Sequence, residues 1–102
     1  MIFVIATIET VAGKRDAFLQ EFHRLVPSVL AEEGCIEYGP TVDAPTDIDA
    51  QKPSGDNVVT IVEKWDSVDA LKAHLVAPHM AEYRVRVKDL VAEVQLQILQ
   101  PA

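Results

Sequence analysis

The spacing of apolar residues divides the chain into strand-like and helix-like segments. Residues 2–9 are apolar at nearly every position, which is typical of a strand inside a sheet. From Lys14 onward, apolar residues recur at steps of four, three and four, which predicts an amphipathic helix. Its buried face would carry Phe18, Phe22, Leu25 and Val29. We expect Pro27 to tighten or kink the end of this helix and Gly34 to terminate it.

Two further strands follow, with a long polar segment between them. Residues 35–43 predict a second strand, in which Gly39 and Pro40 indicate a bulge or an edge position. Residues 44–57 are rich in Asp, Pro and Ser and predict a solvated loop that either covers a site or is disordered. Residues 58–65 predict a third strand, which is again apolar on both sides.

The last third of the chain predicts two helical segments and a strand. Ser67 is placed to cap the first segment, with Asp69 in its first turn, and Pro78 opens the second. The expected buried positions are Val68, Leu71 and Leu75 in the first segment and Met80, Tyr83, Val87 and Leu90 in the second. In residues 92–99 apolar and polar side chains alternate, as they do in a half-exposed strand.

The resulting βαββαβ order predicts a single ferredoxin-like α+β domain over residues 1–102. Its antiparallel sheet would have the first and third strands in the middle and helices on one face only. A monomer would then leave Phe3 and Ile5, or their opposite-face neighbours, in water, together with one row of the third strand. At about 25 cal/mol per Å², such a surface is worth on the order of 5–10 kcal/mol. We therefore expect a homodimer packed through the sheet faces.

Charge and composition narrow the possible partners. Sixteen acidic residues against nine basic ones give a net charge of −7, which works against binding to nucleic acid or anionic lipid. No apolar run approaches the about 18 residues of a membrane span, and the start lacks a basic signal-peptide flank, so we expect a soluble cytoplasmic protein. The single Cys35 allows no internal disulfide, and we expect it to be a small buried hydrophobe. The aspartates between residues 43 and 56 lack the spacing of an EF-hand loop, so no metal is expected.

Several short segments, spread over about residues 2–98, occur together in one known family. They are a first strand ending near Glu9, Gly13-Lys14 at the start of a helix, Glu33-Gly34-Cys35-Ile36-Glu37-Tyr38, Val62-Glu63-Lys64-Trp65-Asp66-Ser67, Ala73-His74-Leu75 and Pro78-His79-Met80. In this order they resemble the antibiotic biosynthesis monooxygenase family, and within it the small bacterial members similar to quinol monooxygenase. The resemblance implies a dimeric α+β barrel. It also implies the reaction of the family's enzymes, which oxygenate electron-rich aromatics, such as quinols or polyketide anthrones, without a cofactor.

A deprotonated phenol can itself reduce dioxygen. The protein therefore needs to supply only a base, a dry cavity and hydrogen bonds to a developing oxyanion. His74 is the preferred base, and the alternative is a helix-border histidine bonded to a backbone carbonyl. Glu63 shares one side of its strand with Ile61 and Trp65, where an unpaired carboxylate is costly. It would be a buried carboxylate of raised pKa, or one that orients His74, and the alternative is a salt bridge across strands.

The substrate contacts are expected around a cavity between helices and sheet, where the family resemblance places it. They are Trp65, Tyr38, Tyr83, His79, Met80 and Phe22. The alternative for the aromatic residues and the methionine is that they only fill the core, with the tyrosine hydroxyls at its rim. The alternative for His79 is a neutral, solvated side chain, and we expect His23 to be a surface residue.

The chain also departs from better-characterised members of the family. Some anthrone oxygenases have an asparagine before the strand-end Trp, where this chain has Thr60 and Ile61. Haem-degrading relatives need an Asn and a His where this chain has Ala6-Thr7 and residues 84–86, which counts against haem. The leading hypothesis is an oxygenase of a small quinol or polyphenol that uses neither metal nor flavin. The alternatives are an isomerase or detoxifying enzyme for a small reactive carbonyl compound, and a non-catalytic ligand-binding dimer.

Overall fold

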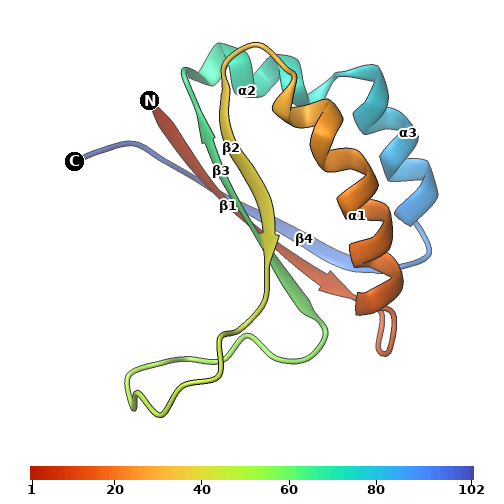
Figure 1. Ribbon diagram of the computed structural model, residues 1–102, viewed down its shortest axis with the longest axis vertical. Helices are drawn as coiled ribbons and strands as arrows, with labels where there is room; N and C mark the ends of the chain where they lie inside the picture. Colours follow the sequence, from red (N-terminus) through yellow and green to blue (C-terminus); the bar gives the residue numbers. More distant parts are fainter.

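Four strands and three helices make up the computed structural model, which describes residues 1–102. In chain order they are β1 (Ile2–Thr10), α1 (Arg15–Leu30), β2 (Cys35–Thr41), β3 (Val58–Trp65), α2 (Val68–Leu75), α3 (Pro78–Val87) and β4 (Val91–Leu99). The strands form one antiparallel sheet in the order β2-β3-β1-β4. All three helices lie on the same face of this sheet (Figure 1). The predicted ferredoxin-like fold, with β1 and β3 in the middle, is confirmed.

The core lies between the sheet and α1. In the register of β1 with β3, Val4 pairs with Glu63 and Ala6 with Ile61, so alternate residues of both strands face the helices. Four residues of α1 pack against them and are fully buried, as predicted: Phe18, Phe22, Leu25 and Val29. The helix runs past Pro27 to Leu30, which shows that one missing amide donor near its end does not terminate it.

Several predicted boundaries and faces are wrong in detail. The second strand ends at Thr41 rather than residue 43, and its register irregularity lies between Cys35 and Glu37 rather than at Gly39 and Pro40. The predicted edge position is correct, because β2 pairs only with β3. Val68 is exposed rather than buried, since it is the first residue of α2 and points away from the sheet. Leu90 follows the end of α3 and only partly packs on the core.

The last strand differs most from its prediction. Val94, Leu96 and Ile98 were expected to be buried on one face, and they do pair with the helix-facing residues of β1. Each is nevertheless between 44 and 54% exposed. The reason is that the helices pack over β2, β3 and one another, so the β4 side of the sheet has no substantial helical cover. An apolar row therefore stays open in the single chain.

The segment between β2 and β3 is a surface loop that projects away from the helices (Figure 1). Asp43 Oδ2 accepts hydrogen bonds from the amides of Ser54 (2.8 Å) and Gly55 (3.0 Å), which closes the loop on itself. The loop is thus held by its own polar groups, as a solvated segment must be. None of the three helices has the length and apolar character that spanning a membrane requires.

Gly34 sets the path of the chain between α1 and β2. Its φ is +83°, a region that side-chain-bearing residues rarely adopt, and a Cβ built on it would lie 2.6 Å from the Cβ of Ala70 in α2. The Gly34 carbonyl also accepts a hydrogen bond from the amide of Asp66 (2.8 Å). This glycine therefore lets the turn after α1 lie directly against α2.

We expect Gly34→Ala to lower the free energy of unfolding by about 2–4 kcal/mol, because it adds a left-handed backbone strain of about 1–2 kcal/mol and a steric clash of similar size. Gly13→Ala is the matched control, since Gly13 has a φ of +79° but open space around it. Urea unfolding of both variants measures the difference. Equal losses for the two would contradict the close packing of Gly34 on Ala70.

Candidate functional site

A cavity of about 460 Å³ lies between the sheet and α3, within the usual range for small-molecule sites. Twelve of its 16 lining residues are hydrophobic. The sheet contributes Ala6, Ile8, Tyr38, Ile61, Glu63, Val91, Val94 and Leu96, and the helices contribute Phe22, His74, Leu75, Met80, Tyr83, Arg84 and Val87, with Lys88 just after α3. No residue of the predicted 44–57 loop lines this cavity.

Polar atoms of the cavity wall have no partner within the protein. Every buried side-chain nitrogen or oxygen has a hydrogen-bond partner. Nε2 of His74 and the hydroxyls of Tyr38 and Tyr83 make no hydrogen bond, so these atoms keep some accessible surface although the three residues are largely buried. Because all three residues line the cavity, these atoms are available to a ligand inside it.

His74 is fixed at the wall by a carboxylate and two aromatic rings. It lies in the last turn of α2, and its side chain is only 2% exposed. Its Nδ1 is 2.9 Å from Oε2 of Glu32, and its ring lies 4.7 Å from Trp65 and 5.4 Å from Tyr38, centroid to centroid. An ionised carboxylate only accepts hydrogen bonds, so Nδ1 carries the proton and Nε2 keeps its lone pair. The alternative of a bond to a backbone carbonyl is therefore wrong.

Burial also sets the charge of His74. Desolvation lowers its pKa below the ordinary value, although the hydrogen bond and the negative charge of Glu32 oppose this shift. His79 and Arg84 lower it further. The ring is thus neutral near pH 7, which is the form that can accept a proton.

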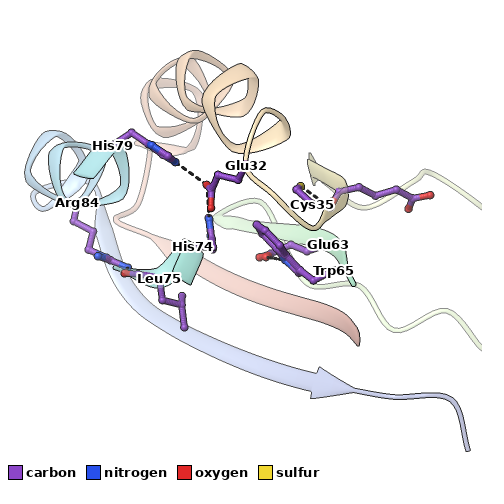
Figure 2. Close-up of polar contacts among 9 residues, drawn as sticks. Glu32, Cys35, Glu63, Trp65, His74, Leu75, His79 and Arg84 are labelled. Carbon is purple, nitrogen blue, oxygen red and sulfur yellow. Dashed lines mark hydrogen bonds and ion pairs between the residues drawn. The ribbon is translucent and has the colours of Figure 1, made fainter. Parts of the chain in front are cut away.

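Glu32, which the sequence analysis missed, connects two histidines. It lies in the turn after α1, and its Oε2 is also 2.6 Å from Nε2 of His79 (Figure 2). His79 is therefore partnered rather than simply solvated, and it does not line the cavity, so its position does not support substrate contact. The only signal in the sequence was an acidic residue just before the predicted helix-ending Gly34, and nothing local pairs it with a histidine 42 residues later.

Glu63 is a buried carboxylate with a tryptophan as its partner. It is 5% exposed, and its Oε1 accepts a hydrogen bond from Nε1 of Trp65 (2.9 Å). Burial raises the pKa of Glu63 to about 7, although the Trp65 bond opposes the shift. No cation pairs with it and it does not bond His74, so both the salt bridge and the orienting role are wrong. Trp65 is fully buried and does not line the cavity, so it is not the predicted pocket wall.

The remaining predicted contacts do surround the cavity. Tyr38 stacks on Phe22 (5.4 Å), Tyr83 meets Phe22 edge-on (5.9 Å), and Met80 joins them in the wall. Burial raises the pKa values of both tyrosines, so their hydroxyls stay protonated and can donate. Cys35 is half-buried rather than fully buried, and burial raises the pKa of its thiol to about 11. His23 is exposed, as predicted.

Comparisons with known proteins agree with this architecture. The family model described as "Antibiotic biosynthesis monooxygenase" matches residues 1–86. The protein named probable quinol monooxygenase YgiN, from Escherichia coli (strain K12), is 44% identical over 103 residues, covering 99% of this chain and 98% of the relative.

Two solved structures share the fold over nearly the whole chain. PA3566 from Pseudomonas aeruginosa superposes with a TM-score of 0.81 at 24% identity, covering 99% of this chain and 93% of that one. Rv0793 from Mycobacterium tuberculosis gives 0.78 at 25% identity, covering 99% and 94%. The four-stranded sheet, the cavity beneath α3 and the match to the family model over most of the sequence lead to one conclusion: the chain belongs to the antibiotic biosynthesis monooxygenase family.

Proposed function

We propose that the chain is a monooxygenase that oxidises a small quinol or polyphenol with dioxygen and uses neither metal nor flavin. The observation that carries the proposal is the neutral His74, whose unpaired Nε2 faces a cavity lined mainly by hydrophobic side chains. The printed name of the 44% identical relative, a probable quinol monooxygenase, supports the substrate class. A cavity of about 460 Å³ accommodates one or two aromatic rings.

Proton removal is the first step. A phenolic hydroxyl bound against His74 gives its proton to Nε2, and the imidazolium that forms keeps its Nδ1–H bond to the Glu32 carboxylate. That carboxylate stabilises the new positive charge, as the acid of a catalytic dyad does. The hydroxyls of Tyr38 and Tyr83 can donate hydrogen bonds to the phenolate oxygen that remains.

The oxidation then balances without an external reductant. The phenolate passes an electron to dioxygen, and the resulting superoxide and semiquinone combine at a ring carbon to form a peroxide. Cleavage of its O–O bond leaves one oxygen atom on the ring, and the other departs as water with two protons. The substrate supplies all four electrons, because the quinol becomes a hydroxylated quinone. The protonated form of Glu63, which also lines the cavity, can donate to the departing oxygen.

The sheet face away from the helices has no cover in the single chain. The face of the sheet away from the helices carries half-exposed Phe3 and Ile5 and exposed Val62, although the Lys64 ammonium, 5.4 Å from the Phe3 ring centre, makes it less apolar than expected. We propose that two copies pack through these sheet faces as a homodimer.

Oxygen consumption tests the reaction. Turnover of a quinol is expected to stop under anaerobic conditions, and product made under labelled dioxygen should gain one labelled oxygen atom. His74→Gln should lower kcat by about 10²–10⁴-fold, since a general base is lost, whereas His23→Gln at the surface should have no effect. Turnover without oxygen, or a product of unchanged mass, would contradict oxygenation and favour the isomerase alternative.

The raised pKa of Glu63 predicts a pH-dependent stability. Between the unfolded pKa near 4.3 and the folded value of about 7, the folded state holds a proton that the unfolded state has lost. This contribution of Glu63 is therefore present at low pH and is lost as the pH rises to 7. Glu63→Gln keeps an acceptor for Trp65 without the titration, so we expect it to be more stable than the wild type at pH 8 by about 1–3 kcal/mol and nearly equal at about pH 4, below the unfolded pKa.

Denaturant unfolding at the two pH values measures this difference. Glu82→Gln, an exposed change without hydrogen-bond partners, is the control and should show no such pH dependence. A Glu63→Gln variant that is less stable than the wild type at pH 8 would show that burial of the ionised carboxylate does not destabilise the folded state.

Sedimentation tests the dimer. At micromolar concentration we expect a particle of about twice the 11.2 kDa chain mass. Ile5→Glu, on the sheet face, should convert it to a folded monomer, because a charge cannot be buried unpaired. Val85→Glu, on an exposed position of α3, should remain dimeric. A wild type that sediments as a single chain would exclude this assembly.

A further inference from the structure

Three ligand-type side chains meet beside the cavity. Glu32, His74 and His79 each direct one ligand atom to a common point, and the three atoms lie within 4.8 Å of one another. They come from the turn after α1, the last turn of α2 and the first turn of α3 (Figure 2). Three separate elements therefore hold the cluster, so its spacing is set by the tertiary fold rather than by one flexible segment.

We propose that this cluster binds a divalent first-row transition cation such as Zn²⁺, and that the bound ion switches off His74 as a base. The second half of this proposal rests on the proposed function; the first half does not. Two imidazoles and one carboxylate suit ions of this class, whereas Ca²⁺ and Mg²⁺ prefer oxygen ligands throughout.

The cluster needs only a small rearrangement to accept the ion. A tetrahedral ion with bonds of about 2.0–2.2 Å places its ligand atoms roughly 3.3 Å apart, whereas Oε2 of Glu32 now lies 2.9 and 2.6 Å from the two histidines. Glu32 would have to withdraw by about half an ångström. The two histidine nitrogens, which lie no more than 4.8 Å apart, would have to come to the same spacing. Glu32 lies in a turn rather than within a helix, and its Oε1 makes no hydrogen bond, so the carboxylate is free to rotate.

Access and charge also permit binding. The His79 side chain is 30% exposed, so an ion can approach from solvent and keep a water ligand there. Arg84 is the nearby cation that opposes binding, but its guanidinium donates to the Leu75 carbonyl at 2.7 Å. The net charge of −7 favours cation approach over the whole molecule.

The ion would act on the base and not on the substrate. Neither Glu32 nor His79 lines the cavity, so the ion lies behind the His74 ring. Coordination takes the Nδ1 lone pair, and the ring proton therefore moves to Nε2. The cavity-facing nitrogen then changes from a proton acceptor to a donor, while the ring stays neutral. A base that has lost its lone pair cannot deprotonate a phenol.

Calorimetric titration of the chelator-treated protein with Zn²⁺, and the visible absorption of Co²⁺ in its place, test the site. We expect one ion per chain for the wild type and for His23→Gln, the same change at an exposed histidine. His79→Gln keeps an amide that can donate to Glu32 but removes a ligand, so affinity should fall at least about tenfold. No binding by the wild type, or equal binding by His79→Gln, would overturn the site.

Nitrogen NMR of the His74 ring tests the switch without turnover. Saturating Zn²⁺ should move the proton from Nδ1 to Nε2 in the wild type and leave His79→Gln unchanged. In oxygen-consumption assays Zn²⁺ should inhibit the wild type and His23→Gln but not His79→Gln. Unchanged or increased activity of the zinc-loaded wild type would overturn the switch. Because binding and tautomer are read without catalysis, a protein with no quinol turnover would refute the proposed function and leave the site standing.

Discussion

The hydrogen bond between Glu32 and His74 is the interaction on which the site depends. It joins the turn after α1 to the end of α2 and places the imidazole against the ring of Trp65. The indole nitrogen of Trp65 in turn donates a hydrogen bond to Glu63. A hydrogen bond to a charged group contributes about 1.5–3 kcal/mol and leaves a costly unpaired group when it is broken. One carboxylate outside the cavity therefore decides the position and the tautomer of the histidine, whereas burial keeps its ring neutral.

The sheet imposes a second constraint, because helices cover only part of one face. The cavity uses Val94 and Leu96 of β4 as a wall, yet both side chains are about half exposed in the single chain. Oxygen chemistry on a phenolate requires exclusion of water, since water protonates the reactive intermediates. A site that is open along β4 would meet that requirement only with cover from outside the chain.

Most of the fold could be predicted from the sequence, because each helix and strand has its own characteristic spacing of apolar residues. Runs apolar on both sides identified the two central strands, alternation identified the last strand, and the steps of three and four from Phe18 to Val29 identified the buried face of α1. Glu63 was recognised as a buried acid for the same reason, since it interrupts an apolar row. Glu32 could not be found in this way, because its partner is 42 residues distant and no periodic pattern links a turn to a helix end. The exposure of β4 was missed because alternation reports which residues share a face, not whether anything covers it.

One physical cause gives the acid and the base of the cavity their opposite shifts. Removal from water disfavours charge, so it raises the pKa of Glu63 and lowers that of His74. Near neutral pH the histidine is therefore neutral and the carboxyl group is in part protonated, so neither adds a full charge to a cavity wall that also contains Arg84 and Lys88. In the proposed reaction, transfer of a phenolic proton to His74 would create an ion pair inside the cavity. The Glu32 carboxylate, placed behind the ring before the substrate arrives, stabilises the cation of that pair without having to reorganise.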